Sequence, residues 1–377
     1  MRVNIILFSI LLGFLTACGK NENRELKNQS NIWELEIIDS IQVDYLGRIW
    51  NLSFKNDYGY LKDITTNSIV KFDTSGNIVA KKTYPDQGPF AVFWISSLTV
   101  SDEDELFASS YREVIHHFDK DLNLIERFEM PFLSESRGGR KNAKNIQLWR
   151  DKILLWYPGR DGISPYTPHF YRDYPLLELF DPKTLTSDSL VRIPPSSKFN
   201  SDLFFGSPTL QFSVKGDYLY LALSNDPQIH LYSLEEKGKW LESIPFNPTD
   251  FQLIPGQDEP VGYVSGNTMY EASINGIFTT ENGFIVYYSG GIDEETFQQF
   301  ELNKPENFPL YPQYRKNYLK IYQTNSGLSN EIVVPPFIEE ILNIESIDKP
   351  FYALRNDEYL GEERDYLTFY KLQLNRK

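Results

Sequence analysis

The residues best suited to ligand binding in this 377-residue chain lie in one aromatic loop, residues 156–176. Tyrosine rings, arginine guanidinium groups, a carboxylate and a histidine follow one another there. Aromatic faces next to Arg and Asp could stack on a sugar or clamp a carboxylate, or the loop could pack against its neighbours. The candidate ligand-binding residues in this loop are Tyr157, Arg160, Asp161, Tyr166, His169, Tyr171 and Arg172.

A basic island in the preceding loop adds two candidates, Arg137 and Arg140. It interrupts an acidic chain, which holds 37 basic and 52 acidic residues and has a net charge of −15. The two arginines could receive an anionic group, or the island is a solvated loop. The acidic balance repels phosphate backbones, so we expect no nucleic-acid partner.

Signals for catalysis are weak. His116 and His117 are adjacent on an expected strand, so their side chains point to opposite faces and cannot share one metal ion. His230 lies between apolar residues, and we expect it to be structural, which leaves His169 as the one candidate acid–base histidine. No Gly-rich phosphate loop, nucleophile elbow or HExxH motif is present. We therefore name no catalytic residue and favour a binding protein over an enzyme.

The sequence leaves a calcium site as an alternative. Asp226, Asp357 and Glu358 belong to loops that we expect on one face, and converging carboxylates there could hold Ca²⁺ at about 2.4 Å. The sequence does not show that they converge, so we predict neither a metal site nor another cofactor. A metal-dependent lactonase, lyase or hydrolase with its site on that face is the alternative function.

The N-terminal residues predict where the protein is delivered. A short basic start precedes an apolar run over residues 5–15, which is shorter than the roughly 20 residues that span a bilayer. Small residues then precede Cys18, the only cysteine. This layout is typical of a secretory signal and resembles a bacterial lipobox, which implies that Cys18 becomes the lipid-carrying mature N-terminus. We predict a signal peptide over residues 1–17, an anchor and flexible tether over 18–31, and one folded domain over 32–377.

The elements that must position the loops form a repeat of short strands. In each unit a strand ends in an aromatic residue, and the first five units continue through a polar turn into a further strand. These aromatic anchors are Phe72, Phe118, Phe180, Tyr232, Tyr322 and Tyr370. Another strand pair precedes most anchors, so each unit has four antiparallel strands. We expect six units rather than seven, because residues 246–322 supply only one further hairpin.

Four-stranded units repeated in this way predict an all-β fold, a six-bladed β-propeller. The last unit lacks its outer strand, and we expect Trp33–Val43 to supply it and close the ring. All long connections then lie on one face, where we expect a ligand site over the central channel, although the loops could simply cover the blade ends. These connections are 84–92, 132–144, 157–175, 195–209, 246–268, 290–316 and 356–365.

The lipobox, the polar tether and repeats such as IVKFDTSGNIV resemble the TolB-like six-bladed β-propeller lipoproteins of Bacteroidota, which include domains of unknown function. The resemblance implies a protein held on the outer membrane through lipid on Cys18, facing either the periplasm or the exterior. It supplies no catalytic residues. The predicted function is a lipid-anchored binding or interaction module for a glycan, a peptide or an envelope protein.

Overall fold

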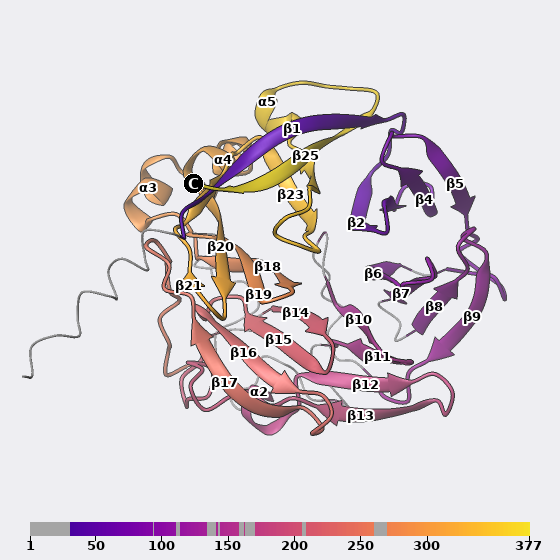
Figure 1. The fold of residues 1–377 in the computed structure, drawn as a ribbon, viewed down its shortest axis with the longest axis horizontal. Coiled ribbons are helices and arrows are strands. Elements are labelled where there is room, and N and C mark those ends of the chain that lie inside the picture. The colour runs from indigo at the N-terminus through magenta and orange to yellow at the C-terminus, as the bar shows by residue number, and fades with distance from the viewer. Residues whose placement is uncertain are drawn as a thin grey trace, which may run out of the picture.

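Six antiparallel sheets surround a central channel in the computed structural model of the protein (Figure 1). The structure describes residues 31–92, 94–110, 114–133, 141, 144–157, 162, 170–205, 209–259 and 270–377. Each sheet is one blade, and the inner strands of neighbouring blades contact one another around the channel. The predicted six-bladed propeller is therefore confirmed.

Each blade is built from consecutive strands, apart from the last. Blade 1 holds β2 (Ile49–Lys55), β3 (Tyr58–Asp63), β4 (Ser68–Asp73) and β5 (Ile78–Thr83). Blade 2 holds β6 (Ile95–Val100), β7 (Leu106–Ser110), β8 (Val114–Phe118) and β9 (Leu124–Glu129). Blade 3 holds β10 (Ile146–Trp149), β11 (Lys152–Leu155), β12 (Leu177–Asp181) and β13 (Thr186–Leu190).

The other three blades follow in chain order. Blade 4 holds β14 (Leu210–Lys215), β15 (Tyr218–Leu223), β16 (Gln228–Ser233) and β17 (Lys239–Pro245). Blade 5 holds β18 (Ser273–Thr280), β19 (Gly283–Ser289) and β20 (Asn317–Gln323), with β21 (Gly327–Leu328) and β22 (Ile332–Val334) both paired to β20. Blade 6 holds β23 (Ile338–Asn343), β24 (Phe351–Arg355), β25 (Leu367–Arg376) and β1 (Trp33–Val43).

Strand β1 closes the ring as predicted. It pairs antiparallel with β25 from Trp33 opposite Arg376 to Val43 opposite Leu367, with one register shift between Ile37 and Asp39. The first and last strands of the chain therefore lie side by side in one blade (Figure 1).

The aromatic anchors and the turns after them explain why the repeat folds this way. Phe72 and Phe118 are fully buried at the ends of their strands. The next residue in each case is an aspartate whose carboxylate accepts backbone N–H groups of the turn. Asp73 accepts from Ser75 and Asn77, and Asp119 accepts in the same way from its own turn. The carboxylate thus satisfies donors that a tight turn leaves unpaired.

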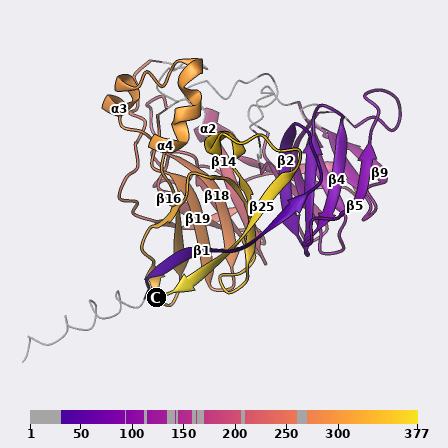
Figure 2. The ribbon, with the colours of Figure 1, turned by 90° about the horizontal axis from the view of Figure 1, so that it is seen from above.

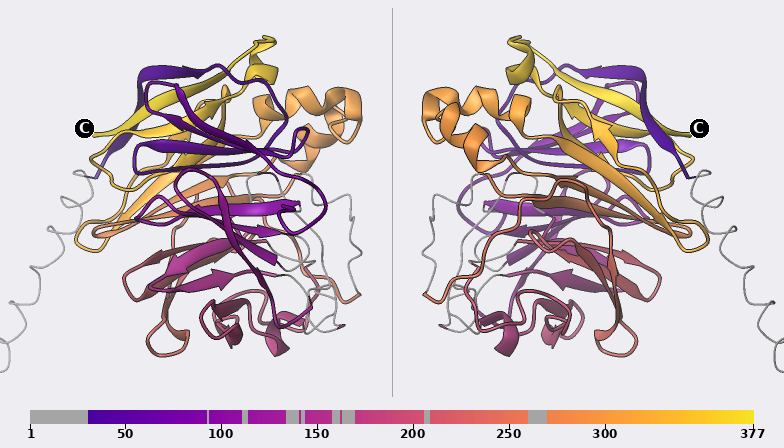
Figure 3. Two further views of the ribbon diagram at one scale, coloured as in Figure 1. Left: turned by 90° about the vertical axis from the view of Figure 1, so that its right-hand side faces the viewer. Right: turned by 90° about the vertical axis from the view of Figure 1, so that its left-hand side faces the viewer.

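The connections divide the molecule into two faces. Turns from first to second and from third to fourth strands are short and share one face, which we call the short-turn face. The opposite, long-connection face carries α3 (Glu294–Gln299), η2 (Pro305–Leu310), α4 (Tyr311–Tyr314) and α5 (Asp357–Leu360). Helices α3 and α4 project from the ring on this side (Figures 2 and 3). No helix in the described ranges is long and apolar enough to cross a membrane.

The start of the described chain lies on the short-turn face. Strand β25 runs from the long connection after β24 toward the short-turn face, and β1 runs antiparallel to it. Trp33 is therefore near the C-terminal residues, at the end of the ring away from α3 and α4 (Figure 2).

Candidate functional site

A cavity of about 780 Å³ occupies the channel at the centre of the ring. The inner strands of all six blades line it, namely β2, β6, β10, β14, β18 and β23. The lining residues come mainly from the C-terminal halves of these strands and from the turns that follow, so the mouth lies at the short-turn face. Its volume is in the range of about 300–1,000 Å³ found for small-molecule sites.

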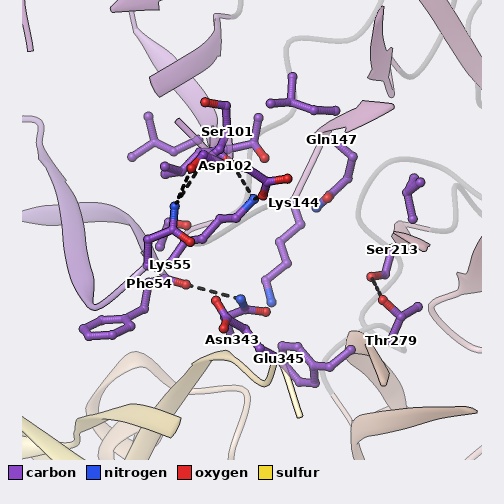
Figure 4. A pocket seen from close by; sticks show the side chains of 18 of the residues that line it. Phe54, Lys55, Ser101, Asp102, Lys144, Gln147, Ser213, Thr279, Asn343 and Glu345 are labelled. Carbon is purple, nitrogen blue, oxygen red and sulfur yellow. Dashed lines mark hydrogen bonds and ion pairs between the residues drawn. The ribbon is translucent and has the colours of Figure 1, made fainter. Parts of the chain in front are cut away.

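Lys144 crosses this cavity. It precedes β10 in blade 3, and its Nζ donates a hydrogen bond to the carbonyl oxygen of Leu342 in blade 6, at 3.1 Å. The same Nζ lies 4.2 Å from the centre of the Phe278 ring in blade 5. Burial lowers the pKa of Lys144 to about 8, and the carboxylate of Glu340 acts in the opposite direction. Figure 4 shows the side chain extending through the cavity toward Asn343.

Amide and hydroxyl groups make up much of the remaining lining. The Asn343 side-chain amide donates to the Phe54 carbonyl oxygen at 3.2 Å, which leaves its own oxygen available. The hydroxyls of Ser213 and Thr279 are 3.1 Å apart and join blades 4 and 5 (Figure 4). The partly exposed Gln147 also lines the cavity.

The cations at the mouth are already paired. Lys55 Nζ lies 2.7 Å from an Asp102 carboxylate oxygen and also donates to the Val100 carbonyl oxygen at 3.1 Å. Arg150 is 2.7 Å from an Asp217 carboxylate oxygen across two blades. Lys144 also has an anionic neighbour, because the carboxylate of Glu340 interacts with its ammonium group through charge.

Most of the predicted ligand-binding residues lie outside the described part of the chain. These are Arg137, Arg140, Arg160, Asp161, Tyr166 and His169, and Cys18 also lies outside it. Tyr171 is the second residue of α2 (Phe170–Asp173). Tyr157 donates from its hydroxyl to the Ser110 carbonyl oxygen at 3.4 Å and has its ring against Phe132. Arg172 is 2.8 Å from an Asp202 carboxylate oxygen on the long-connection side. Neither of these two residues lines the channel cavity.

The histidines of the strands are held in different surroundings. His116 is fully buried, whereas His117 lies 3.0 Å from a Glu105 carboxylate oxygen, as expected for side chains on opposite faces of a strand. His230 Nδ1 is 2.8 Å from the Ser243 hydroxyl, and its Nε2 is 3.7 Å from an Asp226 carboxylate oxygen. These contacts place His230 in a buried polar network, in agreement with a structural role.

Two of the three acidic residues considered for calcium, Asp226 and Asp357, have other partners. The Ser197 hydroxyl donates to Asp226 at 2.6 Å. Burial acts to raise the pKa of Asp226, but hydrogen bonds from His230, Ser197 and Gln228 outweigh it and lower that pKa. Asp357 pairs with Arg355 at 3.3 Å. Among the residues that the structure describes, no three His, Cys, Asp or Glu side chains gather into a metal-ligand group.

The residues that line the channel are not among the candidates expected from the sequence. Those candidates belong to long loops, whereas Gln147, Ser213 and Asn343 lie on inner strands. A usable signal was present, because polar residues alternate there with buried apolar ones, as Ser213 follows the buried Phe212. No local sequence pattern marks Lys144, because its place in the channel depends on how all six blades close into a ring.

Comparisons with known proteins establish the fold. No protein-family model matches the chain, and no curated protein matches it. The chain is similar to the crystal structure of a DUF4221 family member from Bacteroides vulgatus, with a TM-score of 0.67 at 10% identity over 92% of this chain and 100% of that one. It is also similar to a Bacteroides fragilis protein named as exported, with a TM-score of 0.56 at 14% identity over 93% of this chain and 97% of that one. The predicted resemblance to propellers of Bacteroidota is thus confirmed for the fold.

Proposed function

We propose that this protein is a glycan-binding protein of the cell envelope and that its ligand enters the channel cavity. The observation that carries the proposal is a cavity of about 780 Å³ lined from all six blades and crossed by Lys144. Amides, hydroxyls and the Lys144 ammonium group face its interior, and sugar hydroxyls both donate to and accept from such groups. A closed ring holds these groups in fixed positions, which favours binding.

Delivery to the envelope is part of the proposal. The lipobox-like residues before Cys18 support a lipid anchor, and a protein with the same fold is named as exported. Metabolic labelling with a clickable fatty acid tests this: the intact chain should be labelled, and Cys18→Ser should abolish the label. An equal label on both proteins would contradict anchoring at Cys18.

Thermal unfolding of the mature chain, with Cys18→Ser so that it can be purified without lipid, tests binding. A ligand present at 100 times its dissociation constant adds about 2.7 kcal/mol to the free energy of unfolding, which is visible as a shift. We expect a shift with members of a glycan panel, and Gln147→Ala should reduce it while Arg172→Ala, outside the cavity, leaves it unchanged. A shift with peptides alone would show that the ligand is a peptide and not a glycan. No shift with either panel would contradict a ligand in the channel.

A second candidate function, docking of an envelope protein, is favoured by the long-connection face. The four most exposed large apolar side chains of the described residues are all on connections of this face: Trp94, Leu46, Leu133 and Phe90 are 80%, 70%, 67% and 66% exposed. Exposed apolar side chains gathered on one face are typical of protein contacts.

Site-specific photocrosslinking tests this second candidate. A photoreactive amino acid at Trp94 should capture one envelope protein in cells, and Phe90→Ser should weaken the capture. The same group at Trp240, which is partly exposed on outer strand β17, is the matched control. Equal capture at both positions would show that the contact is nonspecific.

A further inference from the structure

We propose that the channel cavity binds the end of a glycan chain rather than an internal segment, and that Lys144 forms the floor on which the terminal sugar rests. This inference rests on the proposed glycan-binding function and adds to it the part of the glycan that is recognised. It follows from one side chain that lies across the ring, from the walls of the cavity and from the groups at its mouth.

The Lys144 side chain crosses the centre of the ring. It starts just before β10 in blade 3, and its Nζ donates to the Leu342 carbonyl oxygen in blade 6 at 3.1 Å. Blades 3 and 6 are on opposite sides of a ring of six, so the side chain lies across the channel (Figure 4). Its Nζ also lies 4.2 Å from the centre of the Phe278 ring, and the Glu340 carboxylate attracts it through charge. These contacts with blades 5 and 6 hold the side chain in place.

The cavity ends within the ring, at the level where Lys144 begins. Its lining starts at Leu98 in β6 and at Ser213 in β14, which are past the first residues of these strands. On the side of the long connections, Ser97 and Asn145 are buried, and the Asn145 backbone N–H donates to the Ser97 hydroxyl oxygen at 2.9 Å. A ligand therefore enters from the mouth at the short-turn face and meets Lys144 at the bottom.

Polar contacts between neighbouring blades hold the wall of the cavity together. The Lys55 Nζ of blade 1 lies 2.7 Å from an Asp102 carboxylate oxygen of blade 2. An Arg150 guanidinium nitrogen of blade 3 lies 2.7 Å from an Asp217 carboxylate oxygen of blade 4. The Asn343 side-chain amide of blade 6 donates to a carbonyl oxygen of blade 1 at 3.2 Å. A chain that entered the cavity would have to break such contacts to leave it sideways.

This shape distinguishes a chain end from an internal segment. An internal segment continues in two directions, so inside the cavity it would have to pass the Lys144 side chain or turn back toward the mouth. A chain end continues in one direction only, and it reaches the floor while the rest of the chain leaves through the mouth. The contacts of Lys144 with the opposite blade thus favour binding of a terminal sugar.

The groups between floor and mouth suit two consecutive sugars. The hydroxyls of Ser213 and Thr279, which are 3.1 Å apart, line the cavity and suit the hydroxyls of a terminal sugar. Trp149 ends β10 at the mouth and is partly exposed. Its Nε1 donates to an Asp217 carboxylate oxygen at 3.2 Å, and the Arg150 guanidinium lies 4.8 Å from its ring centre. The indole is therefore fixed, and its exposed part offers an apolar surface to the next sugar.

The experiment measures binding to the purified mature chain carrying Cys18→Ser by ligand-observed NMR titration. The probes are maltotriose, cellotriose and chitotriose. Each trisaccharide is used unmodified, as an aryl glycoside that blocks the reducing end, and with a benzylidene acetal that blocks the opposite end. For a trisaccharide that binds, we expect one blocking group to weaken binding at least tenfold and the other to change it less than twofold, because only one end lies against the floor.

Two substitutions of Lys144 separate the shape of the floor from its charge. Lys144→Ala removes the side chain that crosses the channel, so the trisaccharide blocked at the buried end should regain much of the lost affinity. Lys144→Met keeps an unbranched side chain of similar length without the ammonium group and should retain the tenfold difference. Lys141→Met, on the same segment but paired with Glu339, is the control and should behave like the wild type. Thermal unfolding verifies that each variant is folded.

Each outcome decides the inference. Equal binding of the unmodified and both blocked forms would show that an internal segment is bound, which overturns the inference and leaves the glycan-binding function standing. An equal loss with both blocking groups would overturn it as well, because neither end would then lie outside the cavity. A tenfold difference that survives Lys144→Ala would overturn the assignment of the floor to Lys144. Absence of binding by all three trisaccharides would overturn the proposed function together with the inference. The comparison of blocked forms uses the wild-type side chain at position 144, so it decides between end and internal segment even if a variant does not fold.

Discussion

At the scale of single residues, this propeller buries ionisable side chains in several places, among them the channel cavity and a cluster around Glu271. Lys144 lies in the channel cavity, whereas Glu271 and Lys198 belong to a cluster beneath the long connections of blades 4 and 5. Lys198 Nζ donates to the Asn225 side-chain oxygen at 2.5 Å and to the Ile254 carbonyl oxygen at 3.2 Å. Glu271 is only 8% exposed, and its Oε1 has no hydrogen-bond partner in the described residues. Burial raises the pKa of Glu271 to about 7, with Lys198 and Arg315 acting in the opposite direction.

The raised pKa of Glu271 predicts a specific dependence of stability on pH. A carboxyl group whose pKa is higher in the folded state stabilises the fold fully below its unfolded pKa of about 4.5, and this contribution is lost as pH rises through about 7. Relative to Glu271→Gln, the wild-type free energy of unfolding should fall by about 3 kcal/mol between pH 4.5 and pH 8. Denaturant titrations across this range measure it, and Glu281→Gln, an exposed site, is the control. Parallel pH curves for wild type and Glu271→Gln would show that Glu271 does not titrate in this way.

At the scale of the strand, much of each blade could be predicted from its own sequence. The aspartates after Phe72 and Phe118 fix tight turns through their own carboxylates, so the sequence motif alone predicts the turn. The strand pair around residues 102–105 was likewise predictable, because an acidic turn separates two apolar runs. This acidic turn also contacts another blade, since Asp102 pairs with Lys55 of blade 1. Contacts between blades join residues that are far apart in the chain, so no local sequence pattern predicts them.

Within blade 1, Gly59 makes room for an aromatic anchor. It is opposite Phe72 in the β3–β4 register, and a Cβ at Gly59 would lie 2.0 Å from the Phe72 ring. Gly59→Ala should therefore displace a fully buried ring and destabilise the fold by about 1–3 kcal/mol, measured by urea denaturation. In a Phe72→Leu background, which shortens the side chain, the same substitution should cost less. Equal costs in both backgrounds would show that the ring is not the obstacle.

At the scale of the whole molecule, ring closure creates the site. Lys144 and Leu342 are far apart in sequence and meet only because blades 3 and 6 face each other across the channel. The sequence could predict six blades and the closing strand from repeats and from the missing outer strand of the last unit. It could not predict the cavity, because no local pattern specifies which residues of six separate strands point to a common axis. The prediction of a site among the long loops reflects the same difficulty.

The closing strand leads to a prediction about the entire ring. If β1 completes blade 6, a chain that starts at residue 44 should lose most of its stability, because β25 then lacks its partner and Trp33, Ile41 and Val43 leave the core. A chain that starts at residue 31 removes only the predicted tether and should unfold like the mature protein, which makes it the matched control.

Adding a peptide of residues 31–43 to the chain that starts at residue 44 should restore part of the lost stability by strand addition. The same peptide should restore sugar binding, since Leu342 and Asn343 belong to the blade that β1 completes. Denaturation midpoints and NMR titrations of the three samples measure both effects, and an unchanged midpoint for the chain from residue 44 would mean that the ring is held by contacts between inner strands alone.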